Sequence, residues 1–376
     1  MENRVVKVGI IGCGGIANGK HMPALAKVKQ AQMVAFCDII PERAEKAAEE
    51  FGVAGAKVYT DYKELLKDKD IEVIHVCTPN LSHGFITIDA LEGGKHVMCE
   101  KPMAKTAADA RKMLEVAKKT GKKLTIGYQN RFRPDSLYLK AACERGDLGD
   151  IYFAKAHAIR RRAVPTWGVF LNEEEQGGGP LIDIGTHALD ITLWCMNNYD
   201  VDTVTGSVFH KLGSLDQAME GNIFGDWDPK TYEVEDSAFG FIRMKNGAIV
   251  NLEASWALNV LDSREASTTL AGTKAGAEIR SGMSYNKNEL IYNQGKNGQL
   301  MEETLSPVGG VAYFGGGGGE EGTIDIKQWL DSILNDTEPL VKPEEALVVT
   351  EILEAIYTSS KTKKPVFFKD GQPITN

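Results

Sequence analysis

The chain has 376 residues, which is enough for two domains and too long for one ordinary hydrophobic core. Hydrophobic residues make up 43% and charged residues 25%, a composition typical of a folded globular protein and not of a disordered one. The formal net charge of −9 argues against nucleic acid and anionic membranes as partners.

The sequence predicts a cytoplasmic protein without a metal site. The first residues run straight into an apolar strand, and no later segment has enough consecutive apolar residues to span a bilayer. The six cysteines include no C-x-x-C pair, so we expect them to be reduced core residues. The seven histidines include no H-x-x-x-H pattern, and we therefore expect no metal.

The N-terminal stretch predicts a dinucleotide-binding loop. An apolar run over 5–11 indicates a buried strand, which breaks into a G-x-G-x-x-A loop that a helix should follow. Gly12 would permit a tight turn, Gly14 would let backbone amides approach a pyrophosphate, and Ala17 would let the helix pack closely on the strand. The alternative is a chance strand-to-helix turn, since the chain contains 39 glycines.

The next strand, 33–38, predicts which dinucleotide is bound. It ends in Asp38, at 38 − 17 = 21 residues past the loop, where a carboxylate can accept hydrogen bonds from both ribose hydroxyls. The same charge would repel a 2′-phosphate, and Ile39 and Ile40 follow where an arginine could have neutralised one. We therefore predict NAD and not NADP, the alternative for Asp38 being an ordinary turn residue.

Residues 1–130 are predicted to form an α/β Rossmann domain, a doubly wound parallel sheet. After the first two strands, the pattern alternates between helices and strands: helix 41–51, strand 73–77, helix 82–92, strand 96–99, helix 106–120 and strand 123–127. A further helix should start at Pro134 and end near Arg145.

Residues 131–376 are predicted to form an α+β domain with a large, mostly antiparallel open sheet. The strand-like runs are 151–161, 201–212, and a hairpin of 239–244 and 248–254 around a turn at 245–247. Helices are expected at 322–335 and 343–360, and the last could pack back on the first domain. We expect 213–230 to be an irregular excursion, and Gly315–Gly319 to be a mobile loop in preference to a plain flexible lead into the next helix.

Three strand ends in the first domain carry polar residues that packing does not require. Because ligands of such sheets sit at the carboxyl ends of the strands, we expect these residues to face the cofactor. They are Thr78, Asn80 and His83 after the third strand, Glu100 and Lys101 after the fourth, and Gln129 and Asn130 after the last. Lys101, which a proline follows, could project an ammonium to the place where a nicotinamide and a substrate hydroxyl meet. The alternative is a solvated lysine.

A second polar group lies in the stretch 177–194. Its glycines and Pro180 indicate a turn, after which apolar residues recur at helical spacing. Asp183 and His187 are four residues apart and can share one side of that helix. A carboxylate beside an imidazole orients it and favours its charged form, as a histidine that accepts a proton from an alcohol requires. The alternative is a helix cap and a core histidine.

Together these motifs resemble the Gfo/Idh/MocA family of oxidoreductases over nearly the whole chain. The motifs are the loop at Gly12, the sequence Glu100-Lys101-Pro102, and Asp183-x-Gly185-x-His187. The resemblance implies a cleft between two domains, with His187 as base and with Lys101 and Asp183 holding and polarising the reacting hydroxyl. It also implies a homo-oligomer assembled through the open face of the second domain's sheet.

We therefore predict an NAD-dependent oxidoreductase that acts on a secondary ring hydroxyl of a sugar, glycoside or cyclitol, with oxidation at C3 of a glucoside as a narrower hypothesis. The alternatives are an enzyme that retains NAD in a closed redox cycle and a non-catalytic NAD-binding sensor. The expected cofactor residues are Gly12, Gly14, Gly15, Ile16, Asp38, Thr78, Asn80, His83, Glu100, Lys101 and Gln129. The expected substrate residues are Asn130, Arg160, Trp167, Asp183 and His187, although Arg160 and Trp167 could instead form a domain or subunit contact.

Overall fold

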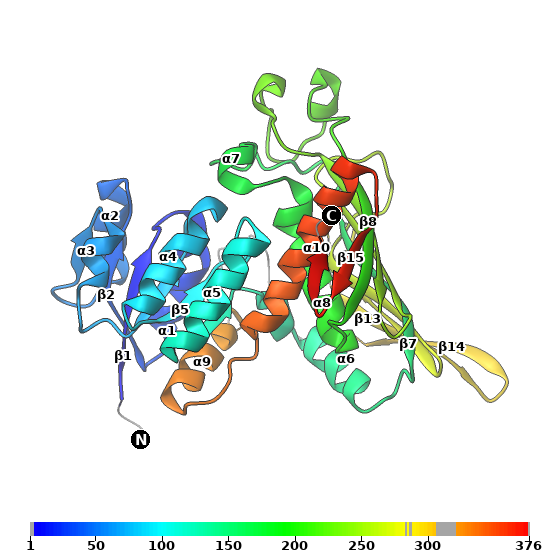
Figure 1. The fold of residues 1–376 in the computed structure, drawn as a ribbon, viewed down its shortest axis with the longest axis horizontal. Helices are drawn as coiled ribbons and strands as arrows, with labels where there is room; N and C mark the ends of the chain where they lie inside the picture. Colours follow the sequence, from blue (N-terminus) through cyan, green and yellow to red (C-terminus); the bar gives the residue numbers. More distant parts are fainter. Residues whose placement is uncertain (1–3, 283, 286–287, 306–320, 375–376) are drawn as a thin grey trace. The chain divides into compact units, whose positions relative to one another are not determined.

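A computed structural model describes residues 4–282, 284–285, 288–305 and 321–374, which divide into two compact units (Figure 1). Unit 1 contains the described residues of Met1–Phe132 and Val311–Leu347. Unit 2 contains those of Arg133–Gly310 and Val348–Asn376. Each unit is therefore formed by two separate segments of the chain, and the segments of the two units alternate along the sequence.

Unit 1 is built on a six-stranded parallel sheet in the order β3-β2-β1-β4-β5-β6. The order reverses between β1 and β4, which makes this the switch point at which such sheets bind ligands. The strands are β1 (Val6–Ile11), β2 (Ala31–Cys37), β3 (Lys57–Tyr59), β4 (Val73–Val76), β5 (His96–Cys99) and β6 (Leu124–Ile126). The predicted doubly wound parallel sheet is confirmed.

Helices follow the strands of unit 1, and those between two parallel strands are the crossovers that such strands require. They are η1 (Ala17–His21), α1 (Met22–Lys27), α2 (Pro41–Phe51), α3 (Tyr62–Leu66), α4 (Asn80–Glu92), α5 (Ala107–Thr120), and the short 3₁₀ turn η2 (Gln129–Phe132). The predicted helix after the glycine loop is present, but it opens with a wider π-helical turn, η1.

The helix α9 (Glu321–Leu334) also belongs to unit 1. Its buried residues Ile326, Trp329 and Leu330 share one hydrophobic core with Val8 and Ile10 of β1. Because α9 completes the core under the first strand, residues 321–347 belong to unit 1, whereas the sequence predicts them in the second domain.

Unit 2 is built on a ten-stranded sheet in the order β14-β13-β12-β11-β7-β10-β9-β8-β15-β16. Its neighbouring strands pair antiparallel, except that β7 and β10 are parallel. The strands are β7 (Ile151–Ile159), β8 (Val201–Phe209), β9 (Ser237–Met244), β10 (Ile249–Ser255), β11 (Arg264–Gly272), β12 (Ala275–Arg280), β13 (Glu289–Lys296), β14 (Gln299–Leu305), β15 (Val366–Lys369) and β16 (Gln372–Ile374). The predicted mostly antiparallel sheet and its hairpin at 245–247 are confirmed.

Helices of unit 2 cover one face of this sheet, which we call the inner face (Figure 1). They are α6 (Pro134–Glu144), α8 (Thr186–Met196) and α10 (Pro343–Thr362), the last of which begins in unit 1. Gly206 of β8 and Gly240 of β9 leave room for Ile356 of α10, since a Cβ at either position would press on that side chain. The opposite, outer face has no helix among the described residues.

The remaining elements of unit 2 are short: α7 (Glu173–Gln176), the π-helical η3 (Leu181–Gly185), η4 (Asp216–Met219) and η5 (Pro229–Thr231). The excursion expected at 213–230 has no strand and only the two short turns η4 and η5. The loop expected at Gly315–Gly319 lies outside the described residues. None of the described helices is long and apolar enough to cross a membrane.

Candidate functional site

The glycine loop after β1 has the geometry that a dinucleotide needs. Gly12 has φ +90°, and a Cβ there would lie 2.7 Å from the carbonyl carbon and oxygen of Cys77, so only glycine fits. A Cβ at Gly14 or Gly15 would meet nothing within 4 Å. The loop is therefore closed against β4 on one side and open on the other, with room for a pyrophosphate at the start of a helix.

Asp38 is held beside this loop. Its carboxylate is buried and accepts hydrogen bonds from the Cys13 N–H over 2.8 Å and the Ile40 N–H over 2.9 Å. The predicted ribose-binding carboxylate thus lies at the end of β2, fixed to the loop that would hold the phosphates. These residues fit NAD, because the glycine loop and the acid predicted to bind the ribose are adjacent.

Glu100, at the end of β5, is the centre of a buried polar network in unit 1. Its carboxylate lies 2.7 Å from His21 Nε2 and 3.1 Å from Lys20 Nζ, both on η1. It also accepts a hydrogen bond from the backbone N–H of Lys101 over 3.1 Å. A Cβ at Gly127 would lie 2.9 Å from this carboxylate, so the glycine after β6 makes room for it.

The charges of this network stabilise one another. Burial opposes the charged form of Glu100, but Lys20 and then His21 outweigh it and hold the pKa of Glu100 well below its usual range. Burial likewise opposes the charged form of Lys20, but Glu100 and Asp325 raise the Lys20 pKa above its ordinary value. Burial, together with His21 and Lys20, lowers the pKa of His75 well below its ordinary value, so His75 is neutral beside His21.

Other polar residues predicted at the strand ends of unit 1 are buried as well. His83 is buried, and its two ring nitrogens lie 2.9 Å from the Thr78 carbonyl and 2.8 Å from the Pro102 carbonyl. Burial lowers the pKa of His83, so its neutral ring lies between the ends of β4 and β5 and donates to one of the two carbonyls. Gln129 lies 3.5 Å from Lys20 Nζ, and Asn80 and Asn130 are buried.

In unit 2, Asp183 and His187 lie on consecutive turns of one continuous helix. Asp183 belongs to η3 and His187 to the first turn of α8, and both are buried. Asp183 is not the helix cap, because the helix begins before it. Instead the Glu235 carboxylate accepts hydrogen bonds from the backbone N–H groups of Gly179 and Leu181 at the start of the helix, over 2.8 and 3.0 Å. An acidic group at this end also suits the helix dipole.

Arg160 and Trp167 differ in exposure. The Arg160 guanidinium is buried and paired with Glu265 over 2.8 Å, and it also donates to the Ala163 carbonyl. Trp167 is 40% exposed and packs edge-to-face against Phe224 and Phe170, with ring centroids 4.8 and 5.7 Å apart.

Sequence reasoning missed several residues that hold the candidate site. They are Lys20, His21 and Asp325 around Glu100, and Glu235 and Trp256 around the helix of Asp183. Trp256 donates its indole N–H to Asp183 over 3.1 Å. The Glu235-Asp236 pair directly before β9 is a visible acidic signal, but nothing in the sequence shows what it binds.

Comparison with known proteins shows the family to which this chain belongs. The chain matches the model of the oxidoreductase family with an NAD-binding Rossmann fold, GFO_IDH_MocA, over residues 6–128, and the model of its C-terminal alpha/beta domain over residues 140–368. The chain belongs to the Gfo/Idh/MocA oxidoreductases. It is an NAD-dependent enzyme, and the expected cofactor and enzyme class are confirmed.

Particular relatives are dehydrogenases. The chain is 35% identical to the D-glucoside 3-dehydrogenase of Escherichia coli over 96% of this chain and 97% of that protein. It is 28% identical to the inositol 2-dehydrogenase of Salmonella typhimurium over 76% of this chain and 80% of that one. A structure of levoglucosan dehydrogenase with NADH and levoglucosan has the same fold, with a TM-score of 0.81, 20% identity, and 97% and 99% of the two chains covered.

Proposed function

We propose that this enzyme oxidises the C3 hydroxyl of a glucoside, with NAD as the oxidant. The near full-length similarity to a D-glucoside 3-dehydrogenase is the observation that carries the proposal. The proposal also agrees with the polar residues of the candidate site, because Lys101, Asp183 and His187 supply a cation, a carboxylate and an imidazole. These are the groups that dehydrogenation of a secondary alcohol needs.

We assign the acid–base work to unit 2 and charge stabilisation to unit 1. His187 accepts the proton of the reacting hydroxyl, and Asp183 orients the same hydroxyl from the preceding turn. The Lys101 ammonium stabilises the negative charge that develops on the substrate oxygen. Bound NAD supplies the acceptor for the hydride that leaves the carbinol carbon.

The cofactor residues of the proposal follow the geometry of unit 1. Gly12, Gly14, Gly15 and Ile16 bind the pyrophosphate through the backbone and the helix terminus. Asp38 binds the adenosine ribose. The polar strand ends at Thr78, Asn80, Glu100 and Gln129 bind the nicotinamide half, and His83 supports them from its place between the Thr78 and Pro102 carbonyls.

The substrate residues in unit 2 include an aromatic surface. Trp167, together with Phe170 and Phe224, presents rings of the kind that stack on a pyranose face. Hydrogen bonds join the two loops that carry them, from Asn222 to the Val164 carbonyl and from Thr166 to the Phe224 carbonyl. Asn130 of unit 1 and the buried Arg160 of unit 2 complete the proposed set of substrate residues, Arg160 by shaping the loop that bears Trp167.

Incubation with NAD and methyl glucosides, free glucose and inositols tests the proposal. We expect NADH absorbance to rise with a glucoside, and the product to be two mass units lighter, with its carbonyl located at C3 by NMR. The absorbance of the enzyme before NAD is added shows whether it retains NADH. Turnover of inositol alone would contradict the glucoside assignment.

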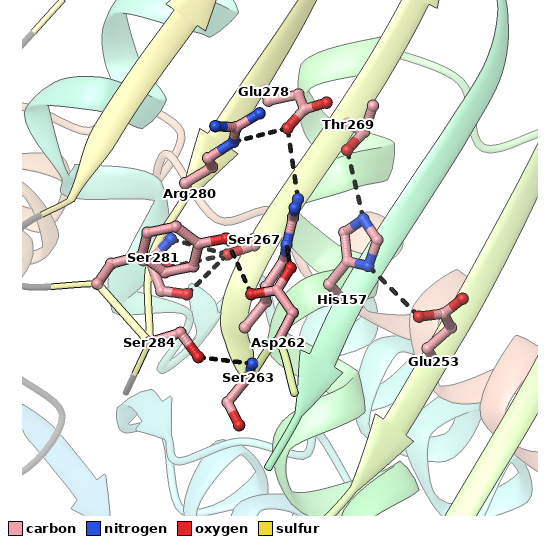
Figure 2. Close-up of polar contacts among 12 residues, drawn as sticks. His157, Glu253, Asp262, Ser263, Ser267, Thr269, Glu278, Arg280, Ser281 and Ser284 are labelled. Carbon is pink, nitrogen blue, oxygen red and sulfur yellow. Dashed lines mark hydrogen bonds and ion pairs between the residues drawn. The ribbon is translucent and has the colours of Figure 1, made fainter. Parts of the chain in front are cut away.

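We propose that the chain forms a homo-oligomer through the outer face of the ten-stranded sheet. Phe209, Phe239 and Phe241 all lie on that face, and Phe209 packs against Phe239 with ring centroids 6.0 Å apart. A polar cluster lies beside them: Figure 2 shows His157 between Thr269 and Glu253. Apolar and charged side chains mixed on one open sheet face suit an interface between copies. Light scattering coupled to gel filtration checks the mass.

We also propose that the enzyme works in the cytoplasm. All six cysteines are free thiols, and five of them are buried, as in proteins kept in a reducing compartment. Cell fractionation of the tagged protein tests this location.

A further inference from the structure

Trp256, the first residue after β10, touches Asp183 directly. Its side chain is fully buried, and its Nε1–H donates a hydrogen bond to Asp183 Oδ2 over 3.1 Å. We propose that Trp256 is a positioning residue, whose indole N–H fixes the Asp183 carboxylate in the orientation that oxidation of the substrate requires. This inference rests on the proposed function, in which Asp183 orients the reacting hydroxyl.

The indole itself is held firmly in place. The Trp256 backbone N–H donates to the Asp236 carbonyl over 3.1 Å, and the Trp256 carbonyl accepts from the Ala163 N–H over 2.9 Å. The ring packs edge-to-face against Phe170, with centroids 6.2 Å apart and planes at 80°. A donor anchored on two sides of its backbone and along its ring can fix the direction of a hydrogen bond.

The helix that carries the acceptor, Asp183, is held by the residue next to Asp236. Glu235, the neighbour of Asp236, accepts hydrogen bonds from the N–H groups of Gly179 and Leu181, which begin the helix of Asp183. Tyr357 donates a further hydrogen bond to Glu235 over 2.9 Å. The consecutive residues Glu235 and Asp236 therefore fix both partners, one through the helix of Asp183 and the other through the backbone of Trp256.

The glycines before this helix make the arrangement possible. A Cβ at Gly178 would collide with the Tyr357 hydroxyl, and a Cβ at Gly179 would collide with the Glu235 carbonyl. The start of the helix therefore approaches Glu235 closely, and Asp183 comes within reach of the indole.

Indole chemistry suits this role. The Nε1–H only donates and does not titrate, so it can engage Asp183 Oδ2 only as an acceptor. A hydrogen bond to a charged group is stronger than one between neutral groups, and removing a partner leaves the buried acceptor short of a donor. Loss of the N–H should therefore affect the chemical step more than the packing.

Trp256→Phe tests the inference by kinetics, because it removes the N–H and keeps an aromatic ring. We expect kcat to fall about tenfold to a hundredfold with KM little changed, as for a lost hydrogen bond to a charged group. Trp227→Phe is the matched control, since Trp227 is a buried tryptophan of the same unit whose N–H donates to the Gly213 carbonyl over 2.7 Å. We expect its kcat to stay near that of the wild type.

A double-mutant cycle separates positioning from packing. If Trp256 acts through Asp183, adding Trp256→Phe to an Asp183→Asn enzyme should cost little further activity. A purely structural Trp256 would lower kcat by the same factor in both backgrounds, and that outcome would overturn the inference.

A spectroscopic readout tests the contact without turnover. The chain has five tryptophans, and Trp256→Phe identifies one of five indole N–H resonances in a ¹⁵N-labelled sample. Asp183→Asn should shift that resonance and leave the Trp227 resonance in place. An unshifted Trp256 resonance would overturn the inference even if the enzyme is active. A wild type that oxidises no sugar would overturn the proposed function and the catalytic role, whereas the resonance would still report the hydrogen bond.

Discussion

Lys101 follows Glu100, and its own backbone N–H is accepted by the Glu100 carboxylate. The backbone of this residue is therefore fixed at the end of β5, whereas its ammonium is the group that we assign to the substrate oxygen. If that assignment holds, the charge of Lys101 matters in the transition state and not in cofactor binding.

Lys101→Met tests this assignment. We expect kcat to fall about a hundredfold to a thousandfold, the usual loss when one stabilising donor is removed, while NAD binding stays measurable. Stopped-flow turnover and titration calorimetry with NAD give the two quantities. Lys112→Met, at an exposed position of α5, is the control that should change neither. Unchanged turnover in Lys101→Met would remove Lys101 from the mechanism.

We assign the preference for NAD to Asp38. Its carboxylate already accepts two backbone N–H groups, so its position beside the glycine loop is fixed, and in the proposed binding mode its charge would face the 2′-phosphate of NADP. We expect Asp38→Asn to lower kcat/KM with NAD and to reduce the preference for NAD over NADP by at least about tenfold, because the amide does not repel phosphate. Steady-state kinetics with both cofactors measure the ratio, with the exposed Asp70→Asn as control. A ratio that does not change would show that Asp38 has no part in cofactor choice.

At the scale of elements, η1, β5 and α9 are joined by one buried charge network. Lys20 of η1 lies 3.1 Å from Glu100 and 3.4 Å from Asp325 of α9, two acids that are far from it and from each other in the sequence. The pKa of Glu100 is well below its usual range, since Lys20 and His21 outweigh the effect of burial. A carboxyl of this kind stabilises the fold fully above its unfolded pKa of about 4.3, and the contribution is lost as pH falls through the folded pKa.

Lys20→Met should therefore destabilise the protein in a way that depends on pH. We expect the free energy of unfolding to fall by about 3 kcal/mol at pH 7, as for a broken buried ion pair. The difference in the free energy of unfolding between the variant and the wild type should become smaller below about pH 4, because protonation of Glu100 removes the ion pair from the wild type as well. Urea unfolding at a series of pH values measures it. Lys67→Met, which breaks an exposed pair with Glu64, is the control, and a loss in Lys20→Met that is the same at every pH would contradict this account.

The same network shows what sequence patterns can predict about elements. The glycine loop, Asp38 and the Glu100-Lys101-Pro102 motif were predictable, because each depends on a strand end and a few neighbouring residues. The ion pairs of Lys20 were not predictable, since Lys20 is 80 residues from Glu100 and still farther from its second partner, Asp325. The contact of Trp256 with Asp183 was not predictable for the same reason, because only the fold brings the end of β10 to the helix of Asp183.

At the scale of the whole molecule, composition and alternation of strands and helices were sufficient to predict two units and their classes. The division of the chain between them was harder to predict. The apolar face of α9 looks like that of any amphipathic helix, and only the unfilled core beneath β1 determines where it packs. Likewise, no run of residues in 264–305 was predicted as strand, although β11 to β14 form four of the ten strands of the larger sheet.

The outer face of that sheet leads to the last prediction, which concerns assembly. Phe241 is 44% exposed at the middle of a broad sheet, and its cross-strand neighbours Thr205 and Asn251 lie on the same face. If copies of the chain bury this face, a charge at Phe241 would be desolvated in the oligomer and solvated in the monomer, so it would favour dissociation.

We therefore expect Phe241→Glu to reduce the mass in solution toward that of the 41.0 kDa chain, with the circular dichroism spectrum of the fold retained. Phe85→Glu is the matched control, because Phe85 is 48% exposed but lies on α4 of unit 1. Light scattering at several protein concentrations distinguishes the two variants, since a weakened interface dissociates on dilution. A monomeric wild type, or equal dissociation in both variants, would show that the outer face does not join copies of this chain.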